Sequence, residues 1–192
     1  AISIILFGGI ISAFLGPSLA NYAKDLVSEN LYVGSYLALA ILTFIPTILF
    51  LFYENKTVIQ KNIKYTGRSY LELISQPRFI QAITASAFGY AIMTFLMTAT
   101  PLSMHVMEKM SLSKTGIVIQ FHVASMFLPS LITGHLIKKI GHSNVIYAGL
   151  FLYSITLFIS IFDQSFYNYM IALIFLGLGW NFLFIAGTSL LV

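Results

Sequence analysis

The chain alternates long runs of apolar residues with short segments that hold nearly all of its charges. Six runs stand out, at 1–21, 32–53, 79–103, 114–137, 144–162 and 169–192. A helix needs about 20 apolar residues to cross the hydrocarbon core of a bilayer. Backbone polar groups cannot stay unpaired in lipid, so runs of this length are expected to be helices. The sequence therefore predicts an all-α fold, a polytopic transmembrane helical bundle with six spans.

The composition agrees with a membrane environment. Of the 192 residues, 58% are hydrophobic and only 8% are charged, whereas soluble domains carry roughly 25% charged residues. The chain has no cysteine, which excludes a disulfide framework and a thiolate metal site. In a soluble protein the net charge of +4 would suggest nucleic acid, but here the basic residues first have to be tested as topology signals. We expect the lipid bilayer as a partner, and neither nucleic acid nor a cofactor.

The basic residues between the runs predict which way the helices point. Alternate connections lie on the same side of a membrane, and 54–78 and 138–143 form one such pair. Together they hold seven basic residues, namely Lys56, Lys61, Lys64, Arg68, Arg78, Lys138 and Lys139. Lysine and arginine are enriched in cytoplasmic loops. We therefore predict that both connections are cytoplasmic and that the first span runs outward.

The connection 54–78 also divides the chain. It is the longest of the connections and is partly amphipathic, which favours a linker that lies along the membrane surface. On this division, 1–53 holds two spans of an N-terminal bundle and 79–192 holds four spans of a C-terminal bundle. Both ends of the sequence are apolar and lack the polar or aromatic anchors that usually flank a span. We therefore expect the chain to be a piece of a longer protein.

Two polar side chains in the middle of the spans are candidates for function. His122 is, tyrosines aside, the only ionisable residue deep within a run, and such residues are costly in lipid and often functional. A histidine can also form a structural hydrogen bond to another helix, so a coupling role and a structural role both stay open. Asn181, near the middle of the last run, needs either another helix or a polar cavity as its partner.

Two runs carry special residues at intervals of four. The third run holds the hydroxyl stripe Ser86, Tyr90, Thr94 and Thr98. Hydroxyls can bond to the carbonyls of their own helix, so this stripe favours cavity lining and helix packing about equally. The first run holds the small residues Gly8, Ser12, Gly16 and Ala20, with Pro17 beside them. Small residues on one face let helices approach closely, so we predict a packing face, with a ligand site as the alternative.

The stretch TGHLIKKIGH at 133–142 gathers two lysines and two histidines. Metal binding is one explanation, but His135 and His142 are seven residues apart without an acidic neighbour, and no HExxH pattern occurs. No metal site is predicted. The topology instead makes Lys138 and Lys139 anchors on the cytoplasmic side, so the stretch is expected to contain a tight turn between two spans.

This turn resembles the signature of the major facilitator superfamily of secondary transporters. The residues in register are Gly134, Leu136, Lys139 and Gly141, while Lys138 replaces the usual Asp and His142 the usual Arg. Four more segments resemble helices five, seven, eight and ten of the family: GGIISAFLGP, QPRFIQA followed by GYAIMTFLMTATPLSM, VIQFHVASMFLPSLITGHLI and GLGWNFLFIAGTSLL. Ala20 and Asn21 stand where the antiporter form has two glycines, which argues against a drug antiporter.

The resemblance covers nearly the whole chain and implies a partial fold of this family, helices five to ten of twelve, from a bacterial inner-membrane protein. The family works by rocking two six-helix bundles about a site near the membrane midplane. Tyr90, Thr94, His122 and Asn181 lie on helices that border this cavity in the family. The resemblance therefore implies candidate cavity or coupling roles for these four residues.

The function expected is transport of a small solute by alternating access, with the missing helices as partners. The absence of a P-loop motif argues against an ATP-driven pump. The span interiors hold no Arg, Lys, Asp or Glu, which favours a neutral or zwitterionic solute. One alternative is a non-transporting remnant of a split or decayed transporter gene. A remote alternative is an intramembrane enzyme.

Overall fold

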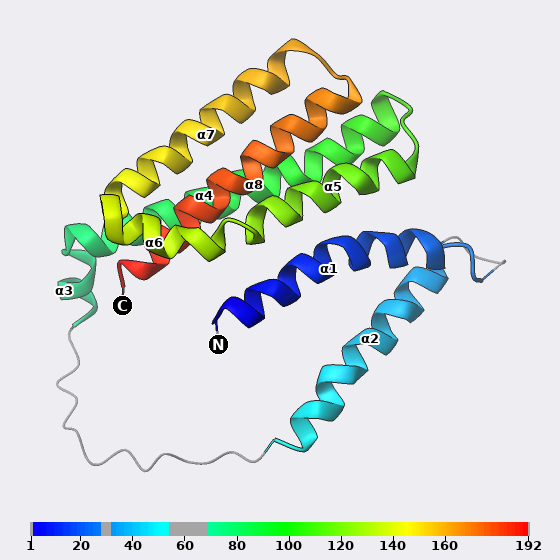
Figure 1. Cartoon of the computed structure of the whole chain (residues 1–192), viewed down its shortest axis with the longest axis horizontal. Coiled ribbons are helices and arrows are strands. Elements are labelled where there is room, and N and C mark those ends of the chain that lie inside the picture. The colour runs from blue at the N-terminus through cyan, green and yellow to red at the C-terminus, as the bar shows by residue number, and fades with distance from the viewer. Residues whose placement is uncertain (1, 28–31, 54–68, 192) are drawn as a thin grey trace.

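A computed structural model describes residues 2–27, 32–53 and 69–191, with side chains from residue 8 onward. Each regular element in these ranges is helical (Figure 1). The α-helices are α1 (Ile2–Ala23), α2 (Val33–Leu51), α3 (Tyr70–Ile74), α4 (Pro77–Leu102), α5 (Leu112–Phe127), α6 (Ser130–Ile140), α7 (His142–Phe162) and α8 (Phe166–Ser189), and α4 continues into a short π-helical turn, η1 (Ser103–Met107).

The predicted all-α transmembrane bundle is confirmed, because each apolar run is helical where the structure describes it, while the number of six spans stays a prediction. By length and composition, the described residues contain four helices that could cross a membrane: α2, α4 together with η1, α7 and α8. The pair α5 and α6, bent by 41° at a short break, makes a fifth if the two helices are counted as one span. The first predicted run corresponds to α1, which has 22 residues.

Helix α8 lies at the centre of the bundle, with α4, α5 and α7 packed around it (Figure 1). Its residues Leu176, Leu183 and Ala186 are fully buried. Glycines bring the neighbouring helices close, as is usual between membrane helices. A Cβ built on Gly149 of α7 would lie 2.8 Å from Leu183 Cγ and 3.0 Å from the carbonyl oxygen of Gly179.

Helices α1 and α2 form a pair beside this bundle. The α1 helix packs along α5, whereas α2 contacts α1 near their connection and then diverges from the bundle (Figure 1). Ser35 Oγ donates a hydrogen bond to the carbonyl oxygen of Ala20 at 2.6 Å. Most of α2 is exposed, including Leu42 and Phe44. Apolar side chains of this kind suit contact with lipid or with another helix.

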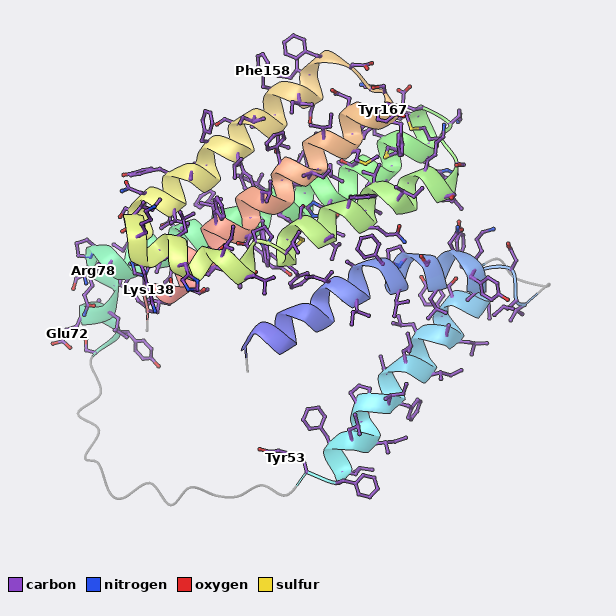
Figure 2. The ribbon with its side chains drawn as sticks, viewed as in Figure 1. Tyr53, Glu72, Arg78, Lys138, Phe158 and Tyr167 are labelled. Atoms are coloured by element: carbon purple, nitrogen blue, oxygen red, sulfur yellow. The ribbon has the colours of Figure 1, made fainter. Side chains whose placement is uncertain are left out.

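The two basic connections begin or end at the same end of the bundle. Arg78, in the first turn of α4, and Lys138, in the last turn of α6, both lie there, while Tyr167 lies at the opposite end (Figure 2). Gln81 Nε2 also donates to Ser143 Oγ at 3.0 Å, which joins the starts of α4 and α7. Residues 54–68 of the predicted linker lie outside the described residues, so the division into two bundles stays a prediction.

A single residue, Gly141, links α6 to α7. Its φ of +85° lies in a region that residues with a Cβ rarely adopt. Lys138 and Lys139 occupy the last turn of α6, where positive charge is favourable next to the unpaired carbonyl groups. Of the other two residues of the turn motif, Leu136 packs partly buried against the core, and Gly134 has no atom within 4 Å of a built Cβ.

Candidate functional site

Asn181 joins α8 to the break between α5 and α6. Its side chain is fully buried. Nδ2 donates hydrogen bonds to the carbonyl oxygen of Met126 at 2.6 Å and to Ser130 Oγ at 2.5 Å. Oδ1 accepts a hydrogen bond from Thr133 Oγ1 at 2.6 Å. Both amide hydrogens are therefore used inside the protein.

The break has a clear cause in Pro129. Proline has no N–H to donate, and its ring clashes with the carbonyl group four residues earlier, so it interrupts a helix. Carbonyl groups of the preceding turn then need other donors. The Asn181 amide supplies one to Met126, so Asn181 braces the bend of 41°. Of the two partners that the sequence left open for Asn181, the structure supplies a helix.

His122 lies where α5 crosses α8. Its side chain is fully buried, and Nδ1 is 2.8 Å from the carbonyl oxygen of Leu173. A carbonyl group only accepts, so Nδ1 donates and carries the ring hydrogen in this contact. Nε2 has no hydrogen-bond partner among the described residues. The contact to Leu173 fits a structural role, and Nε2 is the ring atom left to exchange a proton.

The helices at this crossing are in very close contact. A Cβ built on Gly177 of α8 would lie 2.0 Å from Ser125 Oγ and 2.6 Å from the carbonyl oxygen of His122. The Ser125 hydroxyl itself donates to the same His122 oxygen at 2.6 Å. Only glycine fits at position 177. The position of His122 against α8 therefore depends on Gly177.

Tyr90 and Thr94 occupy an exposed face of α4. Tyr90 is 52% exposed, and Thr94 is also exposed. The hydroxyl of Thr98, one turn further, donates to the carbonyl oxygen of Thr94 at 2.8 Å. Another exposed face of the helix is apolar and carries Phe88 and Phe95. The helix thus presents one face suited to lipid and a second face of hydroxyl groups suited to protein, water or a solute.

The contact between α1 and α5 includes a polar bridge that the sequence did not predict. Gln120 Nε2 lies 3.0 Å from the carbonyl oxygen of Phe14 and 2.7 Å from Ser18 Oγ, and donates to both. Gln120 lies two residues before His122, so the two side chains point to opposite sides of α5. A single glutamine within an apolar run was the available signal, since such a group needs a hydrogen-bond partner in a membrane.

A cavity of about 590 Å³ lies beside this bridge, between α1, α2 and α5. Its polar lining includes Ser18, Asn21, Lys24, Tyr36 and Gln120. Pro101, at the end of α4, also borders it. Pro101 follows Thr94 and Thr98 on the same helical face. The hydroxyl face of α4 therefore leads toward this cavity.

At Gly8 and Gly16, none of the described helices packs closely on the small-residue stripe of α1. Gly8 and Gly16 have no atom within 4 Å of a built Cβ. Together with Ser12 they border an apolar groove of about 600 Å³ between α1 and α2. Pro17 lines the polar cavity instead. The packing role of the stripe stays a prediction.

The four predicted cavity residues therefore form two groups. Asn181 and His122 are buried between helices, whereas Tyr90 and Thr94 are exposed. Tyr90 approaches α8 through its ring, whose centroid is 6.2 Å from that of Trp180. In the part of the chain that the structure describes, no three His, Asp or Glu side chains come together as a possible metal site.

Comparisons with known proteins identify relatives over the whole chain. It is 37% identical over 192 residues to the riboflavin transporter RfnT of Brucella anthropi, covering 99% of this chain and 48% of the relative. It is 29% identical over 208 aligned positions to the uncharacterized MFS-type transporter YdeG of Bacillus subtilis, covering 100% of this chain and 48% of the relative. A third relative, the MFS-type transporter YddS of Bacillus subtilis, is 40% identical over 104 residues, or 53% of this chain and 23% of the relative.

No family model and no solved structure matches the chain. The chain spans about half the length of RfnT and of YdeG. The similarity nevertheless extends across the helices described above, including the bend of α5 and α6 and the turn at Gly141. The resemblance seen in the sequence and the relatives agree: the chain belongs to the major facilitator superfamily of transporters.

Proposed function

We propose that the protein to which this chain belongs moves a small, uncharged solute across a membrane by alternating access. The observation that carries the proposal is the 37% identity to a transporter over 99% of the chain. The exposed hydroxyl face of α4 and the polar cavity beside Gln120 support it, because a solute path needs polar groups that lipid does not cover. All three relatives are named as transporters, which favours transport over an enzymatic reaction.

Riboflavin is the first solute to test. RfnT is named a riboflavin transporter. Riboflavin is uncharged at neutral pH, and the lack of charged residues in the span interiors favours an uncharged solute. Uptake of labelled riboflavin into proteoliposomes should occur with the protein expressed from its complete gene. Residues 1–192 alone should give no uptake, because they span about half of each of two relatives. Absence of uptake by the complete protein for every neutral solute in a panel would favour the alternative, a non-transporting remnant.

We also propose a bacterial inner-membrane location, with 54–78 and 138–143 in the cytoplasm and 1–53 and 79–192 in different bundles. The shared position of Arg78 and Lys138 at one end of the bundle supports this orientation (Figure 2). The contact of α1 with α5 would then join the two bundles. The missing helices of the same transporter would cover the exposed faces of α1 and α2.

Thiol labelling tests the orientation. The chain has no cysteine. A single introduced cysteine is therefore the only thiol that a maleimide can label, once any cysteines in the flanking sequence are replaced. We expect an impermeant maleimide, added to intact cells, to label Gln164→Cys in the α7–α8 connection but not Lys139→Cys at the end of α6. Permeabilised cells should show labelling of both. The reverse pattern would overturn the proposed orientation.

His122 offers a test of coupling to protons. The α8 helix that packs on it has no charged side chain along its length, so a proton at Nε2 would not be neutralised from there. We expect His122→Gln, which can still donate a hydrogen bond toward Leu173, to keep solute binding and to lose the pH dependence of uptake. His122→Ala should lose stability as well. An unchanged pH profile in His122→Gln would assign His122 the structural role alone.

A further inference from the structure

Three aromatic rings meet where α4 packs on α8. Trp180 and Phe184 are stacked, with ring centroids 4.8 Å apart and an interplanar angle of 9°. The Tyr90 ring lies 6.2 Å from Trp180 and 6.4 Å from Phe184, tilted by 60° and 51°. Aromatic pairs are favourable at these separations. These three residues are called the aromatic patch below.

The patch is open on one side only. Tyr90 is 52% exposed, whereas Trp180 is 8% exposed, and Phe184 is partly buried. Trp180 and Phe184 are therefore held in place by the core, and Tyr90 presents ring surface. A rigid pair behind an accessible ring is a surface on which another flat ring can stack with little loss of side-chain freedom.

Trp180 also has an unused hydrogen-bond donor. Its Nε1 is buried and has no partner among the described residues. A buried tryptophan normally finds an acceptor for this group, and leaving a buried donor unpaired is unfavourable. The patch therefore combines ring surface with a donor that lacks an acceptor.

The residues around the patch distinguish it from a surface that faces lipid. Thr94 and Thr98 continue the Tyr90 face of α4, and Thr188 lies one turn beyond Phe184 on α8; all three are exposed. The apolar side chains of α4 that suit lipid, such as Phe88, lie on a different face. The patch is thus bordered by hydroxyl groups that offer hydrogen bonds to a solute.

We propose that the aromatic patch binds the solute and selects a neutral, planar heteroaromatic ring. The ring stacks on Tyr90. Protein atoms cover Trp180 Nε1 in this structure, so they move aside as the solute is seated, and a carbonyl oxygen or ring nitrogen of the solute then accepts its hydrogen bond. Threonine hydroxyls beside the patch bond to polar substituents of the solute. This inference rests on the proposed transport function and names the solute class for it.

Binding to the complete purified protein tests the proposal without transport. The probe is lumichrome, a fluorescent neutral tricyclic heteroaromatic compound, and the non-aromatic comparison compound is ribitol. We expect lumichrome to bind and ribitol neither to bind nor to compete. Tyr90→Leu should weaken lumichrome binding by about tenfold, the upper range for an aromatic pair. Tyr90→Phe, which keeps the ring, should stay within about twofold.

Two further variants separate the ring from the donor. Trp180→Phe keeps an aromatic ring and removes the N–H, and should weaken lumichrome binding by about fivefold, as expected for one lost hydrogen bond. Phe88→Leu is the matched control, because Phe88 is a 64% exposed aromatic residue on the same helix but on a different face; binding should not change. Circular dichroism and elution volume establish that each variant is folded.

The outcomes separate this proposal from the proposed function. Equal lumichrome affinity in Tyr90→Leu and the parent would overturn the patch as a binding surface, and equal affinity in Trp180→Phe would overturn the role of its N–H. Uptake of a non-aromatic solute that is unaffected by Tyr90→Leu would overturn the patch and leave transport standing. Tyr90-dependent binding of lumichrome, without uptake of any solute, would leave the patch standing and overturn transport.

Discussion

Replacing Asn181 by leucine should destabilise the bundle by about 2–4 kcal/mol, because three interhelical hydrogen bonds in a membrane contribute on the order of 0.6 to 1.7 kcal/mol each. The amide is fully buried and bonds to Met126, Ser130 and Thr133. Leucine has a similar volume but cannot satisfy these groups. Thermal and denaturant-induced unfolding of the complete protein in detergent, followed by tryptophan fluorescence, would measure the loss.

A second substitution shows whether this loss arises from the helix break. Pro129→Ala restores a backbone N–H that can bond to the carbonyl oxygen of Ser125 and removes the ring clash. The helix can then continue so that the N–H of Ser130 reaches Met126, which depends less on the Asn181 amide. We expect Asn181→Leu to be less destabilising in the Pro129→Ala background than in the parent, a coupling that a double-mutant cycle detects. The control is Thr188→Val, whose exposed hydroxyl bonds to carbonyl groups of its own helix. If the Asn181→Leu variant were as stable as the Thr188→Val variant, this result would contradict the proposed brace.

Gly177→Ala should lower the stability of the bundle by about 1–3 kcal/mol or more, the usual range for overpacking. The added methyl group would lie 2.0 Å from Ser125 Oγ and 2.6 Å from the backbone oxygen of His122, so α5 must move away from α8. That movement should also weaken the bond between His122 and Leu173. A lower midpoint of thermal unfolding would show the loss of stability.

A matched control and a partial rescue sharpen this test. Gly116→Ala introduces the same methyl group on α5, where a built Cβ has no atom within 4 Å; it should be neutral or slightly stabilising, since alanine favours a helix over glycine. Ser125→Ala removes the nearer of the two clashing atoms but leaves the His122 oxygen. It should therefore restore part of the stability of Gly177→Ala. Equal stability of the Gly177 and Gly116 variants would contradict the close crossing.

The sequence predicted the helices well because the bilayer imposes a simple rule on them. A run of apolar residues has to pair its backbone internally, so 32–53 and 144–162 were identifiable without knowledge of their neighbours. The break within 114–137 was not predicted, although Pro129 was visible and proline is the usual cause of a kink. In membranes a proline can also be accommodated within a continuous helix, and the outcome depends on which groups surround it.

The contacts between helices were harder to predict because they depend on how each helix is rotated and which helix it meets. Small residues at intervals of four predicted a packing face at Gly8, Ser12 and Gly16. In the described structure, however, two of the tight crossings involve Gly177 and Gly179, which do not follow that spacing. The partners of Asn181 could not be predicted for the same reason. One of its two acceptors is the backbone of Met126, and a backbone group has no signature in sequence.

The bend at Pro129 and the single-residue link at Gly141 have a joint mechanical consequence. They enclose the 11 residues of α6 between two joints, so α6 is a short lever. The inner joint is locked by the Asn181 amide. The outer joint consists of one glycine with unusual dihedral angles, spanned by the hydrogen bond from Asn144 Nδ2 to the carbonyl oxygen of Ile140. A force on the basic end of α6 would therefore pass into α7 through Gly141 before it disturbed α5.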